Sequence, residues 1–328
     1  IVEIEQRREG SRIVKYGVAD LAPEAIVEGE IMDRQLVVET IQNLFESREV
    51  RPRHVNTGVS GRGVIVKKIT MEKLPVGEAR EAVHWEAEQH VPYDINDVCL
   101  DFQILEQNAD PKQMEVLLVA AKREMLAAHA DLIRDAGLTP LVIDVGAFAV
   151  QNIMTLNYDF APDEVVAMIN VGSEITTINI VKNSVPLYTQ DLSLGGTNFV
   201  EAVQKNFNLS QSEAEAAVRG EEEVQFDLDQ VVRQVGEDLA VGIERSVLYL
   251  QTSGENDQLN RILITGGGVR IPGLVPFLTQ RHEAPVEVAD PLRRVQFDPS
   301  LFGSHRPDEV SPALSVGLGL ALRKADDR

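Results

Sequence analysis

Residues 262–273 read ILITGGGVRIPG, a run typical of a buried strand that leads into three glycines and then into a helix predicted over 272–281. Because Gly266, Gly267 and Gly268 have no side chains, their backbone N–H groups can lie close to an anion or a nucleotide. A tight strand-to-helix turn would use the same residues, so this stretch alone leaves both interpretations open. It is not a P-loop, since the chain has no Gly-Lys-Ser/Thr, and it lacks the spacing of the dinucleotide-binding fingerprint.

A second glycine turn is predicted at residues 170–177, which read NVGSEITT and continue the apolar run 165–169. Gly172 permits a sharp reversal between two strands. The hydroxyls of Ser173, Thr176 and Thr177 are groups that can donate hydrogen bonds to phosphate oxygens. An ordinary hairpin would show the same pattern.

A third turn, at Gly195 and Gly196, introduces a helix predicted over 198–207. The N-terminus of a helix has unpaired N–H groups and the positive end of the helix dipole, and both favour an anion. A plain helix start remains the alternative interpretation.

Hydrophobic spacing predicts an α/β protein with two lobes. Each lobe opens with short antiparallel strands and continues with strand-helix units, and a long helix is predicted over 228–251. Bilobed folds of this kind bind ligands between their halves. The predicted ranges are a first lobe at 1–62 and 138–163, an inserted subdomain at 63–137, a second lobe at 164–198 and 236–328, and a small helical subdomain of the second lobe at 199–235.

Composition and charge narrow the classes of function. With 328 residues, 44% of them hydrophobic, the chain is long enough for two ordinary globular domains. The net charge of -21 repels phosphate backbones and no basic run counters it, so we expect no nucleic-acid partner.

No apolar run approaches the roughly 18 residues of a membrane span and no signal peptide opens the chain, so we expect a cytoplasmic location. Cys99 lies in an apolar run and is expected to be a buried small hydrophobe.

Three other candidates have plainer interpretations. His84 and Glu88 lie one helical turn apart, but no third ligand accompanies them, so we expect a solvated face and no metal site. Trp85 could mark a partner surface, although a packed core aromatic is the default. Asp144, at a predicted strand end between the lobes, is the one candidate for a general base, and a structural role explains it equally well. We therefore assign no catalytic residue.

Together these elements resemble a known superfamily. The hairpin 170–180, the helix start 195–197, the turn 265–268 and the final helix 311–323 follow the order and spacing of the actin, Hsp70 and sugar kinase superfamily, whose bilobed fold is ribonuclease H-like. The inserted subdomain resembles that of the cell-division protein FtsA rather than that of actin. The PilM family of type IV pilus assembly proteins is similar over essentially the whole chain, most closely at the stretches 59–67 (VSGRGVIVK), 86–93 (EAEQHVPY) and 244–246 (ERS).

The resemblance implies a binding site for ATP with Mg²⁺. The cofactor-binding residues that it implies are Asn170, Gly172, Ser173, Thr176, Thr177, Gly195, Gly196, Glu244, Gly266, Gly267 and Gly268. Those within 170–177 would form the second phosphate loop, and Gly195 and Gly196 would lie beside the phosphates or the ribose. Glu244 would reach the ribose or the base, and residues 266–268 would border the adenosine.

Two departures from the superfamily pattern concern hydrolysis. Asn170 stands where the second phosphate loop usually has Asp, and an amide keeps an oxygen acceptor but lacks the charge that attracts the cation. The first phosphate loop, an Asp-x-Gly-Ser hairpin, should precede Ile1 and is absent from this sequence, so we expect native sequence upstream. We therefore expect ATP binding in the intact protein, with weak or absent hydrolysis.

The resemblance also implies a role and partners. The role is a scaffold of the type IV pilus assembly platform at the inner face of the inner membrane. The chain would bind the N-terminal cytoplasmic tail of PilN, in a groove near residues 64–68 and 85–93, and link it to the motor ATPases; ring formation by several copies is also implied. Alternatives that stay open are an ATP-hydrolysing enzyme, a small-molecule kinase, and an FtsA-like cell-division protein. The last is expected to carry an amphipathic C-terminal membrane helix, which residues 323–328 (RKADDR) do not form.

Overall fold

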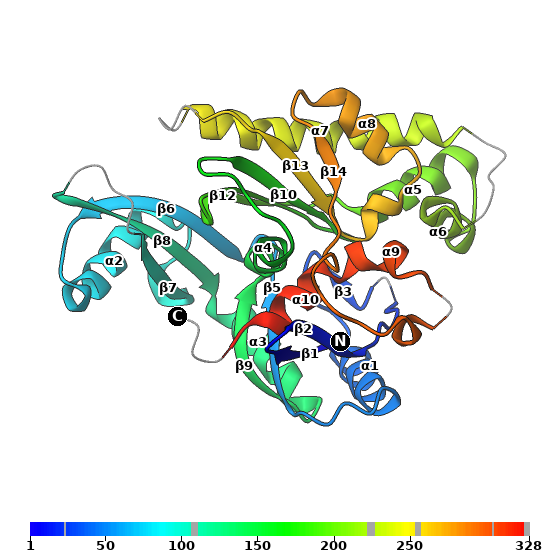
Figure 1. The fold of residues 1–328 in the computed structure, drawn as a ribbon, viewed down its shortest axis with the longest axis horizontal. Coiled ribbons are helices and arrows are strands. Elements are labelled where there is room, and N and C mark those ends of the chain that lie inside the picture. The colour runs from blue at the N-terminus through cyan, green and yellow to red at the C-terminus, as the bar shows by residue number, and fades with distance from the viewer. Residues whose placement is uncertain (23, 106–110, 222–226, 253–256, 304, 325–328) are drawn as a thin grey trace.

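The computed structural model describes residues 1–328 except 23, 106–110, 222–226, 253–256, 304 and 325–328. Figure 1 shows a sheet with long helices at the top, a second group of strands and helices below it, and a small three-stranded sheet with a helix that extends to the left. The helices α4 (Gly146–Asn157) and α10 (Ser315–Leu322) lie in the centre (Figure 1). We refer to the upper body as the second lobe and to the lower body as the first lobe.

The second lobe is built on a five-stranded sheet with the order β12-β11-β10-β13-β14. The strands are β10 (Val165–Val171), β11 (Thr176–Lys182), β12 (Val185–Leu192), β13 (Arg261–Thr265) and β14 (Val286–Val288). β10 pairs antiparallel with β11 and parallel with β13, and six of its seven residues are buried, as expected for a strand covered on both faces. The helices that share its main apolar core are α5 (Gly196–Phe207), α6 (Gln211–Arg219), α7 (Leu228–Thr252) and α8 (Leu274–Arg281).

The first lobe contains three separate strand pairs, of which the pair of β3 (Ile26–Val27) and β4 (Glu30–Ile31) is antiparallel and very short. β1 (Val2–Arg7) pairs antiparallel with β2 (Gly10–Tyr16), and β5 (His54–Val59) pairs parallel with β9 (Thr139–Val145). The helix α1 (Arg34–Ser47) also lies here. Asp33 begins α1, because its carboxylate accepts a hydrogen bond from the Leu36 N–H at 3.0 Å.

The body at the left of Figure 1 has a sheet with the order β6-β8-β7 and its own buried cluster. Its elements are β6 (Val64–Glu72), α2 (Val76–His90), β7 (Val98–Leu105) and β8 (Gln113–Lys122). The predicted boundary at residue 137 also includes α3 (Arg123–Asp135) in this subdomain. In the structure, however, Leu132 and Ile133 of α3 share a core cluster with Val37 and Phe45 of α1. The buried cluster of the insertion therefore does not include α3, although α3 also contacts β8.

α4 and α10 pack against each other backbone to backbone. A Cβ at Gly319 would lie 1.7 Å from the Ala149 carbonyl oxygen, so only glycine permits this approach. α10 also contacts β1 and β5, and Leu318 shares a core cluster with Ile13 of β2. The predicted second-lobe range 236–328 thus ends in a helix that packs on the first lobe. The short helix α9 (Pro307–Val310) precedes it.

Two expectations about side chains are corrected by the structure. Cys99 is only partly buried, because it lies on the edge strand β7. Trp85 is 68% exposed on α2 and is not a core residue.

Within the described residues, none of the helices is both long enough and apolar enough to span a membrane.

Gly319→Ala is expected to lower the free energy of unfolding by about 1–3 kcal/mol or more, because the new Cβ overlaps the Ala149 backbone and the helices must separate. Gly77→Ala is the matched control, since a Cβ at Gly77 of α2 meets no atom within 4 Å. It should leave stability unchanged or raise it by up to about 1 kcal/mol. Urea unfolding followed by circular dichroism measures both, and equal stability of the two variants would contradict the close helix contact.

Candidate functional site

The hairpin turn between β10 and β11 touches the start of α5. The Gly196 N–H donates to the Gly172 carbonyl at 2.9 Å, and the Thr197 N–H donates to the Ser173 carbonyl at 2.8 Å. A Cβ at Gly195 would lie 2.4 Å from the Ser173 carbonyl oxygen, so glycine is required there. The structure therefore brings together two glycine turns that the sequence places about twenty residues apart.

The N–H groups at the start of α5 are already in use, which corrects one expectation. Besides the two bonds to the hairpin, the Gly195 N–H donates to Asn198 Oδ1 at 2.8 Å, and the Asn198 N–H donates to the Gly195 carbonyl at 3.1 Å. The helix start thus offers an anion no free donor among these four groups. In the hairpin turn, the Ser173 and Glu174 N–H groups have no acceptor among the described residues. Free donors of this kind in a tight turn are able to bind an anion.

The glycine triplet packs against the end of β10. Gly266 has φ +92°, and a Cβ on it would lie 2.3 Å from the Val171 carbonyl oxygen. A Cβ at Gly268 would lie 2.2 Å from Val171 Cγ1, whereas one at Gly267 would meet nothing within 4 Å. The three glycines therefore have different roles: Gly266 and Gly268 permit the close contact with β10, and Gly267 has an open face beside it.

A row of polar residues crosses the sheet close to these turns. Asp191 of β12 pairs with Thr177 of β11. Thr177 pairs in turn with Asn170 of β10, which pairs with Thr265 of β13. Residues paired across neighbouring strands share a face of the sheet. The row ends near the carboxyl ends of β10 and β13, where open α/β sheets bind ligands.

Two of the hydroxyls expected to bind phosphate have protein partners. The Thr176 side chain is buried and donates to the Leu194 carbonyl at 2.7 Å. The Ser173 hydroxyl is exposed and lies 3.1 Å from the Thr197 hydroxyl, at the surface of the turn. Ser173 is thus available to a ligand, whereas Thr176 fixes the hairpin to the segment before α5.

Asp191 and Thr265 are site residues that the sequence pattern did not single out. The Thr265 hydroxyl is buried and lies 2.6 Å from the hydroxyl of Ser315, the first residue of α10. Asp191 Oδ2 accepts the Gly61 N–H at 2.5 Å, and its Oδ1 is buried beside Thr177, its partner in the strand register. Burial raises the pKa of the Asp191 carboxyl above its usual value. Strand register was the missing information, since it alone places Asp191 in the same row as Asn170.

The turn from β5 to β6 links the hairpin to the inserted subdomain. Besides the Gly61–Asp191 bond, Arg62 Nε donates to Ser193 Oγ at 3.2 Å. The Arg62 carbonyl accepts the Tyr93 hydroxyl at 2.8 Å, from the segment after α2. We call residues 60–62 the linker turn, because they contact β12 on one side and continue into β6 on the other.

A second contact holds the hairpin turn itself to the first lobe. The Glu174 carboxylate accepts the Glu28 N–H at 2.5 Å. Next to it, the Ile175 side chain lies between two turns that have positive φ: a Cβ would be 3.5 Å from Ile175 Cδ1 at Gly29 and 3.2 Å from it at Gly61. The hairpin that carries the free N–H groups is therefore fixed directly against the first lobe.

Other predicted residues lie outside this cluster. Glu244 pairs with Arg281 of α8, which also binds Glu237, so its carboxylate is engaged on the α8 side of α7. Asp144 is buried and lies 3.0 Å from Arg323 Nε; burial raises the pKa of its carboxyl, and Arg323 opposes that shift. Nucleotide contact by Glu244 stays a prediction. Among the described residues, no group of three or more His, Cys, Asp or Glu side chains is arranged to hold a metal ion.

Known proteins share this architecture. The family model of the type IV pilus assembly protein PilM matches residues 1–325. The solved PilM-PilN type IV pilus biogenesis complex contains a chain that is 29% identical with a TM-score of 0.87, covering 99% of this chain and 95% of that chain. MreB5 of Spiroplasma citri bound to ADP is 11% identical with a TM-score of 0.53, covering 96% of this chain and 79% of that chain. This likeness is evidence for a shared fold alone. The bilobed α/β fold is therefore actin-like, as the resemblance predicts.

Gly266→Ala is expected to destabilise the protein and to weaken any nucleotide binding, because the Cβ overlaps Val171 and the backbone has a positive φ. Gly267→Ala is the control at the next position, where a Cβ has open space. Thermal unfolding and ATP titration by calorimetry measure both effects. If Gly266→Ala keeps the stability and ATP affinity of Gly267→Ala, the contact of the glycine turn with β10 does not support the site.

Proposed function

We propose, because the chain belongs to the family of the type IV pilus assembly protein PilM, that it is a nucleotide-binding scaffold that holds the cytoplasmic tail of PilN. The observation that carries this proposal is the linker turn. Residues 60–62 contact Asp191 and Ser193 beside the hairpin of β10 and β11, which we call the phosphate hairpin. They lead directly into β6 of the inserted subdomain. A change at the hairpin therefore has a short covalent and hydrogen-bonded route to the insertion.

The ligand that we propose for the cleft is ATP with Mg²⁺. The free N–H groups of Ser173 and Glu174 suit a phosphate, and the open face of Gly267 suits the nucleoside. When bound, the metal ion would neutralise phosphate charge. Asn170 brings no charge toward a cation, and Asp191 is the carboxylate in its row.

Slow or absent hydrolysis forms part of the proposal. A phosphoryl-transfer enzyme needs a group that orients or deprotonates the attacking water. Asp144, the candidate from the sequence, is buried, and its carboxylate is paired with Arg323 and is not open to an attacking water. In this proposal the protein retains its nucleotide, and the presence of nucleotide in the site acts as the signal to the inserted subdomain.

The partner surface that we propose is on the inserted subdomain, near β6 and the residues 85–93. Trp85 is 68% exposed on α2, and large exposed aromatic side chains are common anchors of interfaces. The net charge of -21 favours a tail that is basic or of mixed charge. Contact with the motor ATPases, ring formation and a place at the cytoplasmic face of the inner membrane belong to the same proposal.

Trp85→Ala is expected to weaken binding of a synthetic PilN tail by about tenfold or more, because an exposed anchor is lost without any loss of core packing. Leu248→Ala is the matched control, since Leu248 is 58% exposed on α7 in the second lobe. Calorimetry on the protein gives both affinities. Absence of tail binding by the unmodified protein would refute the scaffold proposal, and equal affinities of both variants would refute this surface.

Saturating ATP is expected to tighten binding of the PilN tail, by a factor within the roughly 5–150-fold range of allosteric couplings. Asp191→Ala should reduce that factor toward one, because it removes the acceptor of the Gly61 N–H in the linker turn. Asp20→Ala, at an exposed position, should keep the full factor. The same titration with and without ATP tests the coupling, and an unchanged factor in Asp191→Ala would show that the linker turn does not carry it.

A further inference from the structure

The outer side of α2, in the inserted subdomain, carries an exposed tryptophan. On the inner side, Ala79, Val83 and Ala87 recur every four residues, are at most 1% exposed, and pack α2 onto its sheet. At about 100° of rotation per residue, Trp85 lies roughly opposite these three around the helix axis. Its side chain therefore points away from the core of the subdomain, which explains why it is 68% exposed.

Three carboxylates share this outer side of α2. Glu81 lies one turn before Trp85 and Glu88 lies one turn after it. Glu78 lies two turns before it, and all three acids are within about 60° of the tryptophan around the helix axis. They are exposed, and within the described residues none of them forms an ion pair. Glu78 is in the first turn, where an acid stabilises the helix itself, so Glu81 and Glu88 are the two that the helix does not account for.

The nearest basic residues of α2 do not neutralise these acids. Arg80 lies about 140° around the helix axis from Trp85, and its guanidinium carbon is 5.9 Å from the centroid of the Phe102 ring on β7. His84 lies about 100° from Trp85. We call Glu81, Trp85 and Glu88 the acidic aromatic face, because they form one side of the helix without a cation among them.

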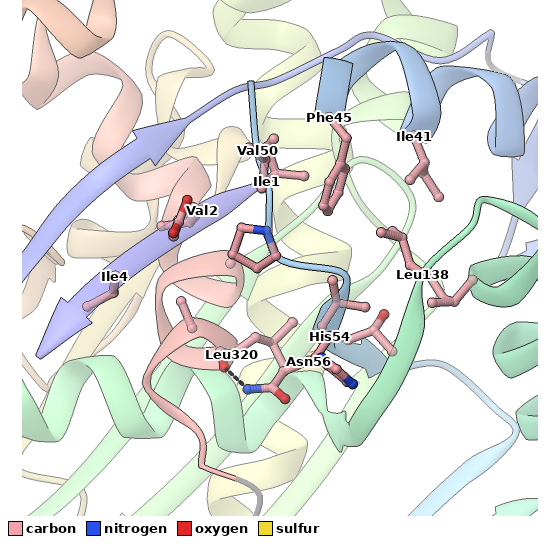
Figure 2. A pocket seen from close by; sticks show the side chains of 17 residues that line it. Ile1, Val2, Ile4, Ile41, Phe45, Val50, His54, Asn56, Leu138 and Leu320 are labelled. Atoms are coloured by element: carbon pink, nitrogen blue, oxygen red, sulfur yellow. Dashed lines mark hydrogen bonds between the residues drawn. The ribbon is translucent and has the colours of Figure 1, made fainter. Parts of the chain in front are cut away.

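Unpacked apolar side chains also occur in the first lobe, but without this charge. Figure 2 shows a pocket there with Ile41, Phe45 and Leu138 along one side. Of the described residues that line it, Glu3 alone carries a carboxylate. The acidic aromatic face is different in kind, because an exposed indole ring lies between two carboxylates.

We propose that the acidic aromatic face binds an arginine side chain of a protein partner. A guanidinium group stacks on the face of an indole ring, and its fixed fork of N–H donors pairs with a carboxylate in a bidentate manner. With Trp85 between Glu81 and Glu88, one arginine can make both contacts. A phosphate group of a nucleic acid or a lipid is repelled by the same two carboxylates. The inference rests on the proposed scaffold function, and it names the chemistry by which the partner is recognised.

Tryptophan fluorescence reports on this face alone, because Trp85 is the one tryptophan of the sequence. The probe is the peptide Gly-Arg-Gly-Arg-Gly, acetylated and amidated at its ends. We expect it to change the tryptophan emission in a saturable manner. The same peptide with citrulline in place of arginine keeps the shape and loses the charge, so it should cause no change. The lysine peptide should bind more weakly by about threefold or more, because an ammonium group is a point charge without the bidentate fork.

The double variant Glu81→Gln with Glu88→Gln is expected to bind the arginine peptide about tenfold or more weakly, because both carboxylates lose their charge and keep their size. Glu39→Gln with Glu46→Gln is the matched control. These two exposed acids of α1 have the same spacing of seven residues, with Asn43 in the place of the tryptophan. Both double variants remove the same total charge, so the control should keep the affinity of the unmodified protein within about twofold.

The arginine site is overturned if the arginine peptide causes no saturable change in emission, or if the two double variants bind it equally. Equal affinities for the arginine and lysine peptides would overturn the assignment to arginine. Calorimetry with the PilN tail separates this result from the scaffold proposal. A protein that binds the tail but not the arginine peptide keeps the scaffold function and loses the arginine site. A protein that binds the peptide but not the tail keeps the arginine site and loses the scaffold function.

Discussion

Backbone contact at the carboxyl end of β10 is the constraint on which the rest of the site depends. The Val171 carbonyl lies against Gly266, and the carbonyls of Gly172 and Ser173 accept the first N–H groups of α5. A side chain at Gly195 or Gly266 would separate these segments. Because each turn fixes the next, the hairpin presents the N–H groups of Ser173 and Glu174 in one place.

The same rigid hairpin connects the lobes. Glu174 accepts the Glu28 N–H and Asp191 accepts the Gly61 N–H, so two acidic side chains of the second lobe bind backbone groups of the first. Charged acceptors make such bonds stronger than neutral ones. Burial raises the pKa of Asp191 because it disfavours the charged carboxylate, and the hydrogen bond from Gly61 opposes that rise in part. Neighbouring phosphate would repel both carboxylates, and this gives a physical reason why nucleotide would alter the contact between the lobes.

The sequence predicts the turns better than it predicts what their groups bind. The glycines at 172, 195–196 and 266–268 mark three turns because glycine is required where backbones meet, and the periodicity of α7 marks a long helix. The sequence does not show that the first N–H groups of α5 donate to carbonyls of the hairpin, because this contact joins segments that are far apart in the chain. Asp191 was missed for the same reason, because only the register of β12 on β11 places it beside Thr177. The boundary predicted at residue 137 puts α3 in the insertion, and the sequence does not show that apolar residues of α3 share a cluster with α1 although α3 follows β8 directly.

The most direct test of a nucleotide-gated scaffold is hydrogen exchange of the protein with and without ATP and Mg²⁺, in the absence of any partner. If the linker turn carries the signal, ATP slows exchange in residues 60–62 and in β6 as well as in the phosphate hairpin. If protection is confined to residues 171–177 and 265–268, the nucleotide binds without reaching the inserted subdomain, and the account of the protein as a gated scaffold is contradicted.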